Sequence, residues 1–394
     1  MAGPPHERGQ IGEIAPIAAC ACERQLLGWG VRKLGLFLLS CALVAPAPAA
    51  WDKIRPSCAD PQSAAADNAV PGPRRVPARV LPVPGDVSLQ LQALIRAPYP
   101  PNVLAPPPST KEEWAALDRR FDSEWSKTLA ALRKSLKVGV EPTTIAGVKA
   151  YLVTPADLPA NNRNRLLLHI HGGGYVAGGG EAATSEAIMM AGIGHYRVIS
   201  VDYRLPPEAP FPAALDDVLA VWDSLAQTVK PQNMAVFGAS AGGGLALAMV
   251  LRAKDEGLPL PAAVAASTPW SDLNKVGDSY YANEYVDNML VTWDGWLSAA
   301  AQLYANGRDL KHPYLSPVYG DFKNFPPTIL TAGTRDLFLS NAVRVHRKMR
   351  RAGVVADLNV YEGMSHAQYA GPDMPESREI FEDITRFFDG RLGR

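Results

Sequence analysis

Short apolar runs alternate with longer stretches of helical periodicity from residue 148 to the C-terminus. The short runs predict strands near 150–153, 166–170, 198–201, 234–237, 263–266, 328–332 and 358–361. The longer stretches predict helices near 182–194, 213–229, 243–256, 340–351 and 376–392. Strands that are apolar throughout and alternate with helices indicate a mostly parallel sheet covered on both faces, which is an α/β fold.

An amphipathic helix is expected upstream of this alternation. Its apolar side chains recur every three or four residues, at Trp114, Leu117, Phe121, Trp125, Leu129, Leu132 and Leu136. Thr110 and Glu113 have the spacing of a capping box, so the helix is expected to begin there and to run for about seven turns. Such an aromatic stripe most often packs against a core, and here it can also form a lid. We assign residues 109–146 to a helical cap segment and 147–394 to the main domain.

Residues 1–50 have the pattern of a secretory signal peptide. Arg32 and Lys33 precede an apolar run of 12 residues, which is followed by the small-residue sequence Ala47-x-Ala49. The run is too short to span a bilayer, and a buried core helix is the competing interpretation. Because about thirty residues precede the basic pair, we expect Met1 to be too early as a start and the protein to begin at Val31, from a GTG start codon.

From such a signal we expect the mature chain to be in the periplasm or outside the cell, without stable membrane insertion once the signal is removed. A second interpretation is a lipoprotein cleaved before Cys41, although this leaves a shorter apolar run. Residues 51–108 are rich in Pro and Ala, and we interpret them as an extended leader that packs only in part.

The composition argues against several function classes. Among 394 residues, 39 Lys and Arg balance 39 Asp and Glu, so no basic surplus points to nucleic acid or to an anionic membrane. The seven His and four Cys show no metal-ligand spacing, so neither a metal nor another cofactor is expected. All four Cys lie near the N-terminus, so the fold needs no disulfide framework.

The segment Gly238-Ala239-Ser240-Ala241-Gly242 stands between a predicted strand and a predicted helix. This is the context of a nucleophile elbow, a sharp turn that presents the serine at the top of a sheet and at a helix N-terminus. Glycines at the flanking positions avoid collisions with the neighbouring strand and helix. An ordinary glycine-rich turn can have the same sequence, so the assignment depends on partners elsewhere in the chain.

Asp336 and His366 are the candidate partners of Ser240, and each directly follows a predicted strand. A serine hydroxyl is a weak nucleophile and needs a base that a third group orients. The carboxyl ends of parallel strands form the edge where sites assemble. Asp336 can instead cap the next helix, and His366 can be a surface histidine. Neither His312, which precedes a proline, nor His346, which lies within a predicted helix, fits the role of base.

The sequence His171-Gly172-Gly173-Gly174 directly follows the predicted strand 166–170. Backbone without side chains can approach a developing oxyanion, and the N–H of Ala241 lies next to the nucleophile, so these groups can form an oxyanion hole. A glycine-rich phosphate loop is the alternative. The chain lacks the distal acid and the Gly-Lys-Ser/Thr ending that phosphate loops use.

Five blocks of the chain resemble the hormone-sensitive lipase family of bacterial carboxylesterases, which belongs to the α/β-hydrolase superfamily. They occur in family order between residue 148 and the C-terminus. The blocks are His171-Gly172-Gly173-Gly174-Tyr175, the stretch from Asp202-Tyr203-Arg204-Leu205 to Ala213, Gly238-Ala239-Ser240-Ala241-Gly242-Gly243, Gly333-Thr334-Arg335-Asp336 and Gly363-Met364-Ser365-His366. The resemblance implies an α/β-hydrolase fold with an N-terminal helical cap.

The resemblance also implies the roles of the site residues. The nucleophile, the general base and the orienting carboxylate are Ser240, His366 and Asp336. The oxyanion donors are the N–H groups of Gly173, Gly174 and Ala241. In this family the segment that begins at Asp202 supports the site and takes no part in catalysis. Tyr175 and Trp270 are candidates for lining the pocket, with core packing as the alternative for Trp270.

The implied substrate is a small-molecule ester with a short or medium acyl chain, hydrolysed by a monomer or a homodimer. The same triad can open lactones or cleave carbamates and aryl amides. A non-catalytic ligand-binding receptor is an interpretation from another class, but such proteins typically lose the histidine that is present here as His366. Two departures from the family pattern, at Ala239 and at Ala367-Gln368, leave the subfamily and the shape of the acyl pocket open.

Overall fold

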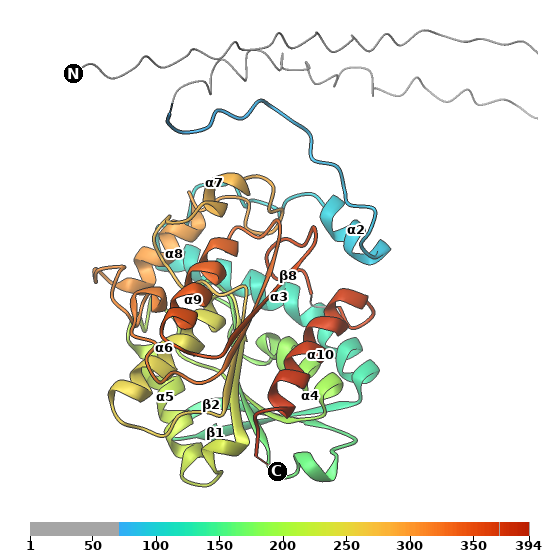
Figure 1. Cartoon of the computed structure of the whole chain (residues 1–394), viewed down its shortest axis with the longest axis vertical. Coiled ribbons are helices and arrows are strands. Elements are labelled where there is room, and N and C mark those ends of the chain that lie inside the picture. The colour runs from blue at the N-terminus through green and yellow to red at the C-terminus, as the bar shows by residue number, and fades with distance from the viewer. Residues whose placement is uncertain (1–70, 370, 394) are drawn as a thin grey trace, which may run out of the picture. The chain divides into compact units, whose positions relative to one another are not determined.

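Eight strands form one sheet in residues 71–369 and 371–393, which are the residues that this computed structural model describes (Figure 1). The strands are β1 (Val138–Ile145), β2 (Val148–Pro155), β3 (Leu166–Ile170), β4 (Arg197–Val201), β5 (Met234–Ala239), β6 (Ala263–Ser267), β7 (Thr328–Gly333) and β8 (Ala356–Tyr361). Their spatial order is β1-β2-β4-β3-β5-β6-β7-β8. Strand β2 runs antiparallel to β1 and β4, while β3 to β8 are parallel. The prediction of a mostly parallel sheet is confirmed.

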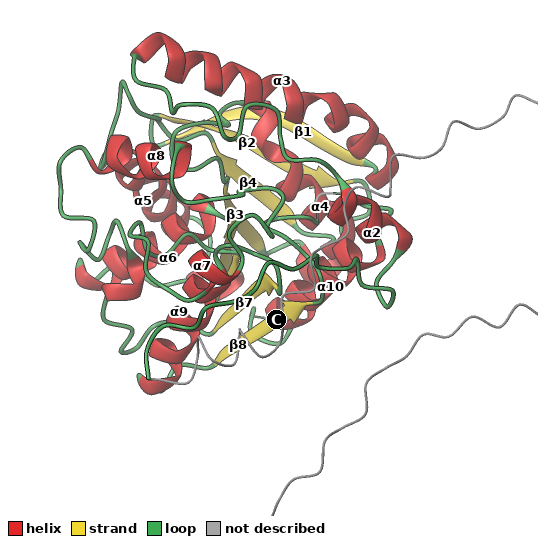
Figure 2. Ribbon diagram, turned by 90° about the horizontal axis from the view of Figure 1, so that it is seen from above, coloured by secondary structure: helices red, strands yellow, loops and turns green. Residues whose placement is uncertain are grey.

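Helices cover both faces of this sheet (Figures 1 and 2). One layer contains α5 (Ala213–Ala226), α6 (Ala241–Asp255) and α9 (Leu339–Arg351), and the other contains α4 (Ser185–Gly194) and α10 (Pro375–Asp389). Two further helices, α7 (Ser279–Ala282) and α8 (Trp296–Ala305), lie in the connection that leaves the carboxyl end of β6 and returns to β7. The periodicity did not predict α7 or α8, because irregular chain surrounds both of them.

The central strands are buried along their whole length, as their continuous apolar sequences predict. Every residue of β3, β5, β6 and β7 is buried. Each face of the sheet has its own apolar core: Trp222 and Leu245 lie in one, and Ile188 and Phe381 lie in the other. Burying a large apolar side chain contributes roughly 1.5–3 kcal/mol. Because both faces are packed, the carboxyl ends of the parallel strands are held at one edge, where they can support a site.

The predicted upstream helix is α3 (Lys111–Leu136). Its N-terminus has the expected capping box: the Thr110 side chain accepts from Glu113 N, and the Glu113 side chain accepts from Thr110 N. Lys137 ends the helix in the left-handed conformation, with φ of 53°. Trp114, Leu129 and Leu132 are buried, and α3 packs against α4 and along β1 (Figure 2). This cap helix is therefore attached to the α4 layer.

The chain after α3 forms an edge strand that the sequence pattern did not predict. Strand β1 lies within the segment assigned to the helical cap, and it pairs along its whole length with β2, from Val138 opposite Pro155 to Ile145 opposite Val148. Its residues are mostly half-exposed or exposed, and it contains Pro142, which cannot donate to a ladder and is tolerated at a sheet edge. The sheet therefore begins at Val138.

The predicted leader contains a short helix, α2 (Leu89–Arg96). Ser88 caps it by accepting from Leu91 N, and also donates from its hydroxyl to the Glu376 carboxylate over 2.6 Å. Leu91 is completely buried, so this part of the leader is folded onto the domain. The chain divides after Arg79, and Val80–Arg394 form one compact unit that contains all the elements named here.

The signal peptide, the start at Val31 and the cleavage before Cys41 all concern sequence outside the described residues. Within 71–369 and 371–393, no helix combines the length and the apolar character needed to cross a bilayer. The four cysteines also lie outside the described part of the chain.

Candidate active site

Ser240 lies at the sharp turn between β5 and α6, as predicted, with φ of 56° and ψ of −124°. A positive φ is strained for a serine and is tolerated only where the surroundings enforce it. The flanking glycines make the turn possible. A Cβ on Gly238 would lie 2.2 Å from the carbonyl oxygen of Ile170, and one on Gly242 would lie 2.0 Å from the same oxygen. The elbow therefore packs directly on the end of β3.

Backbone hydrogen bonds fix the strained turn. The N–H of Ser240 donates to the carbonyl oxygen of Ser267 over 2.9 Å, and its carbonyl accepts from Gly244 N at 3.0 Å and Trp270 N at 2.9 Å. The Ser240 side chain remains half-exposed. It precedes the first turn of α6, whose N–H groups, beginning with Ala241, have no acceptor within the helix and favour negative charge.

Asp336 and His366 meet at the ends of β7 and β8. His366 Nδ1 lies 3.1 Å from Asp336 Oδ1, and both side chains are buried. Gly333, at the end of β7, makes this approach possible, because a Cβ there would lie 1.8 Å from the carbonyl oxygen of Met364. Asp336 Oδ1 also accepts from Phe338 N at 2.7 Å. The predicted acid and base are therefore brought together, in an orientation set by the backbone of both loops.

Ser240 and His366 are not joined by a hydrogen bond. His366 Nε2 is buried and has no hydrogen-bond partner among the described residues. When Nδ1 donates to the carboxylate of Asp336, the lone pair of a neutral imidazole is on Nε2. The nitrogen that a serine hydroxyl requires is therefore available at this edge of the sheet.

Charges around His366 favour its protonated form. Burial by itself lowers the pKa of this imidazole, but the carboxylates of Asp336, Asp287 and Glu186 outweigh burial and raise the pKa above its ordinary value of 6.5. Asp287 is a completely buried carboxylate in the connection between α7 and α8, and the sequence analysis did not identify it. No motif surrounds it, so only its position in the fold reveals it.

The glycine-rich loop after β3 lies against the nucleophile, as predicted. A Cβ on Gly172 would lie 3.3 Å from the Cβ of Ser240. Gly173 has φ of 106°, and a side chain there would collide with the carbonyl oxygen of Ala177 at 1.9 Å. Gly174 has φ of 64°, and its missing side chain makes room for the ring of Trp296. Since only glycine fits these positions, the loop presents bare backbone beside Ser240.

Tyr203 holds this loop in place through its contacts with His171. Its hydroxyl donates to the carbonyl oxygen of His171 over 2.8 Å, and its ring stacks on the His171 imidazole at 4.0 Å between centroids. Burial lowers the pKa of His171 to about 3, so this imidazole is neutral. Arg204 pairs with Asp217 on α5. The segment that begins at Asp202 therefore has the supporting position that the resemblance implied.

Tyr175 and Trp270, which were candidates for lining the pocket, are buried in an aromatic cluster. Trp270 is completely buried and Tyr175 is 1% exposed. The Tyr175 hydroxyl donates to the carbonyl oxygen of Trp270 over 3.1 Å, and its ring stacks on Tyr304 at 4.3 Å. Trp270 also stacks on Phe338, which packs edge-on against His366. Both residues therefore pack behind the loops and give a substrate little surface to contact.

The cap helix α3 reaches the glycine-rich loop. Asp118 accepts from Gly178 N at 2.9 Å, and the ring of Trp125 occupies the space that a Gly178 side chain would fill. Phe121 lies 6.2 Å from Trp296, measured between ring centroids. Phe121, Trp125 and Trp296 form an aromatic roof over the loop. The helical periodicity predicted the first two, whereas Trp296 lies in the connection after β6, where no pattern identified it.

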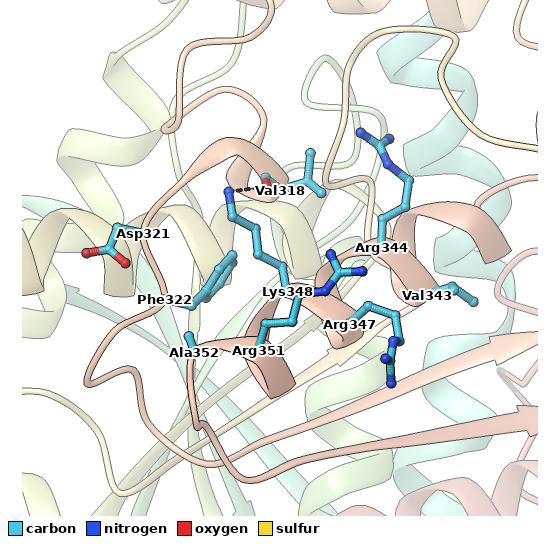
Figure 3. Close-up of a pocket in the computed structure, with 9 residues that line it drawn as sticks. All are labelled: Val318, Asp321, Phe322, Val343, Arg344, Arg347, Lys348, Arg351 and Ala352. Atoms are coloured by element: carbon cyan, nitrogen blue, oxygen red, sulfur yellow. Dashed lines mark hydrogen bonds between the residues drawn. The ribbon is translucent and has the colours of Figure 1, made fainter.

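A hollow of about 620 Å³ lies away from these residues, between α9 and the turn at Pro317–Tyr319. It is lined by Val318, Asp321, Phe322, Val343, Arg344, Arg347, Lys348, Arg351 and Ala352 (Figure 3). Lys348 donates to the carbonyl oxygen of Val318, and Arg344 pairs with Asp272. The basic side chains point in different directions (Figure 3). The lining of the hollow contains no Ser, Thr, Cys or His side chain, so the ester chemistry is assigned to the sheet edge.

The described residues contain no group of three or more His, Cys, Asp or Glu side chains arranged to hold a metal ion. Polar atoms at the sheet edge are a hydroxyl, an imidazole, carboxylates and backbone N–H groups. This set suits nucleophilic attack on a carbonyl carbon, with proton transfer at an imidazole and charge stabilisation by N–H donors.

Comparisons with known proteins agree with this geometry. A family profile described as alpha/beta hydrolase fold matches residues 167–370. The chain is 33% identical over 237 residues to an acetyl-hydrolase from Streptomyces hygroscopicus, covering 60% of this chain and 79% of the relative. The crystal structure of esterase E25 is 43% identical with a TM-score of 0.78, and the match covers 81% of this chain and 99% of the other. An esterase from the bacterial hormone-sensitive lipase family is 28% identical with a TM-score of 0.67, covering 78% and 99%.

Proposed function

Since this chain belongs to the α/β-hydrolase family, in its hormone-sensitive lipase branch, and is a carboxylic ester hydrolase, we propose that it cleaves short- to medium-chain acyl esters through Ser240, His366 and Asp336. The observation that carries this proposal is the hydrogen bond between Asp336 and His366 at the sheet edge where Ser240 also lies. It leaves Nε2 of a buried imidazole without a partner.

In the proposed reaction, Ser240 Oγ attacks the ester carbonyl carbon and His366 Nε2 takes the hydroxyl proton. The Asp336 carboxylate stabilises the imidazolium that forms. When the tetrahedral intermediate collapses, the C–O bond to the alcohol breaks and the imidazolium protonates the leaving alkoxide. Water activated by His366 then hydrolyses the acyl-enzyme, which releases the carboxylic acid and regenerates Ser240.

The proposed oxyanion donors are the N–H groups of Gly173, Gly174 and Ala241. Two observations support this assignment: the Gly172 backbone lies against Ser240, and Ala241 begins helix α6. One such donor contributes about a hundred- to a thousandfold in rate. Side chains at Gly173 and Gly174 would collide with Ala177 and Trp296, which explains why both positions are glycine.

The proposed acyl preference rests on the aromatic roof of Phe121, Trp125 and Trp296. Trp296 packs against the very loop that supplies two of the proposed donors. Bulky rings beside an acyl group limit its length, since apolar pockets discriminate by size. The name acetyl-hydrolase of the Streptomyces hygroscopicus relative supports a short acyl group. A monomer or homodimer remains our expectation for the oligomeric state.

The test is hydrolysis of p-nitrophenyl acetate, butyrate, octanoate and palmitate by the chain beginning at residue 51, with Ser240→Ala and His366→Ala alongside. We expect activity on the shorter esters and its loss in both variants. An organophosphonate should label the wild type and leave Ser240→Ala unlabelled. A folded protein that labels but cleaves none of these esters would redirect the assignment to lactones, carbamates or aryl amides. A protein that resists labelling would be a receptor.

A further inference from the structure

Asp287 connects the two loops that carry the proposed acid and base. Its side chain is completely buried, and its Oδ2 accepts from Leu337 N at 2.8 Å and from His366 N at 3.3 Å. Leu337 directly follows Asp336. One carboxylate oxygen therefore binds the backbone of both loops, at residues next to or identical with the proposed catalytic pair.

The other oxygen of Asp287 anchors the carboxylate itself. Oδ1 accepts from Met289 N at 2.8 Å and from Leu290 N at 3.1 Å. These two bonds form a local turn of a kind common for aspartate. The local turn does not account for the bonds of Oδ2, because their donors lie 50 and 79 residues away in the sequence. Asp287 therefore has a long-range role besides its local one.

The charge of Asp287 is costly to bury, and the structure compensates for it. Four backbone N–H donors surround the carboxylate, and hydrogen bonds from several N–H groups favour the ionised form. Burial and the neighbouring Asp336 act in the opposite direction, and the pKa of Asp287 is raised to about 6. Above that pH the group is an anion that faces His366 and Asp336. Glu186 is a third carboxylate whose charge raises the pKa of His366.

We propose that Asp287 is a positioning residue, which holds the Asp336 and His366 loops in register and adds a second negative charge next to the imidazole. This inference rests on the proposed function of Ser240, His366 and Asp336. A displacement of about 1 Å in such a group can cost about a hundredfold in rate. The hydrogen bond between Asp336 and His366 is thus maintained from a third loop, between α7 and α8.

The test compares Asp287→Asn with the wild type in kcat, KM and the pH profile of p-nitrophenyl butyrate hydrolysis. Asparagine keeps the size of the side chain but places an N–H₂ group against two N–H donors and removes the charge. We expect kcat to fall by about 10- to 100-fold with KM changed by less than about threefold. We also expect the acidic limb of the profile to move to lower pH, because the charge of Asp287 raises the pKa of His366.

Asp272→Asn is the matched control. Asp272 is also a completely buried carboxylate, but it accepts from Tyr319 and pairs with Arg344, on the side of α9. Its loss should lower the melting temperature and leave the acidic limb unchanged. Asp287→Asn would overturn the proposal if kcat stayed within twofold of the wild type, or if kcat fell with no movement of the limb.

Two further arms make the result interpretable. If Asp287→Asn does not fold, Asp287→Glu is used in its place. Glutamate keeps the charge but moves the carboxylate by one methylene. We therefore expect kcat to fall while the acidic limb of the pH profile stays in place. A kcat equal to the wild type in that variant would refute the positioning role. Failure of the proposed function is distinct, since the wild type would then be inactive on every ester or Ser240→Ala would remain active.

Discussion

His366 Nδ1 lies 3.1 Å from Asp336 Oδ1, although the two residues are 30 positions apart and follow different strands. Both strands end at the same edge because β7 and β8 are parallel neighbours, with Gly333 opposite Tyr361. The missing side chain of Gly333 makes room for the backbone of Met364. The contact between acid and base is therefore a product of strand register and of one glycine.

Replacing Asp336 with asparagine should reduce kcat strongly. The charge that stabilises the imidazolium is lost, and we expect a decrease of about 10²- to 10⁴-fold with the fold preserved. Steady-state hydrolysis of p-nitrophenyl butyrate measures the effect, and a melting curve checks the fold. A folded variant that kept kcat within threefold would rule out the orienting role of Asp336.

Activity should fall as the pH decreases through the pKa of His366, which lies above 6.5. His366 must be neutral to accept the proton of Ser240, and the nearby carboxylates raise its pKa above that ordinary value despite burial. Glu186→Gln removes one of these charges, so the acidic limb of kcat/KM should move to lower pH. Asp157→Asn, which changes an exposed partner of His195, should leave the limb in place. A limb that did not move in Glu186→Gln would contradict the electrostatic account.

Gly242→Ala should destabilise the elbow. The new Cβ would lie 2.0 Å from the carbonyl oxygen of Ile170, so β3 or α6 has to shift. We expect the free energy of unfolding to fall by about 1–3 kcal/mol or more, as in other overpacked sites, and esterase activity to fall with it. Urea denaturation measures the first effect. Gly139→Ala is the control, because its Cβ would have only an ordinary contact of 3.8 Å. Equal stabilities of the two variants would contradict the packing argument.

Trp296→Ala should widen the range of acyl chains. Truncation removes a ring that packs against Gly174, and the space gained lies beside the proposed oxyanion donors. We expect the ratio of kcat/KM for octanoate to that for acetate to rise by about 10-fold or more. Tyr281→Ala removes an aromatic ring that is 65% exposed, and it should leave the ratio unchanged. An unaltered ratio in Trp296→Ala would place the acyl group elsewhere.

We further propose that the mature protein is exported. The basic pair Arg32-Lys33, the apolar run after it and Ala47-x-Ala49 support this proposal. N-terminal sequencing of protein from the periplasm or medium of an expressing bacterium should find a start close to Ala50. A cytoplasmic protein with an intact N-terminus would contradict export, and a lipid-modified Cys41 would establish the lipoprotein alternative. A trapped precursor beginning at Met1 or Ala2 would exclude Val31 as the start.

The sequence by itself determined the α/β class, the order of most strands and helices, and the candidate triad. These features depend on local patterns: apolar runs, the helical period, and residues such as Ser240 that directly follow a strand. The capping box of Thr110 and Glu113 is likewise local, and the structure confirms it. These features can be predicted from the sequence because each depends on residues that are neighbours along the chain.

Only the tertiary structure decided which side chains share space. It showed that Tyr175 and Trp270 pack in an aromatic cluster behind the loops. It placed Trp296 against Gly174, and Asp287 between the loops of Asp336 and His366. These contacts join segments far apart in the sequence, so their energies depend on strand register and packing across layers, which no local period encodes.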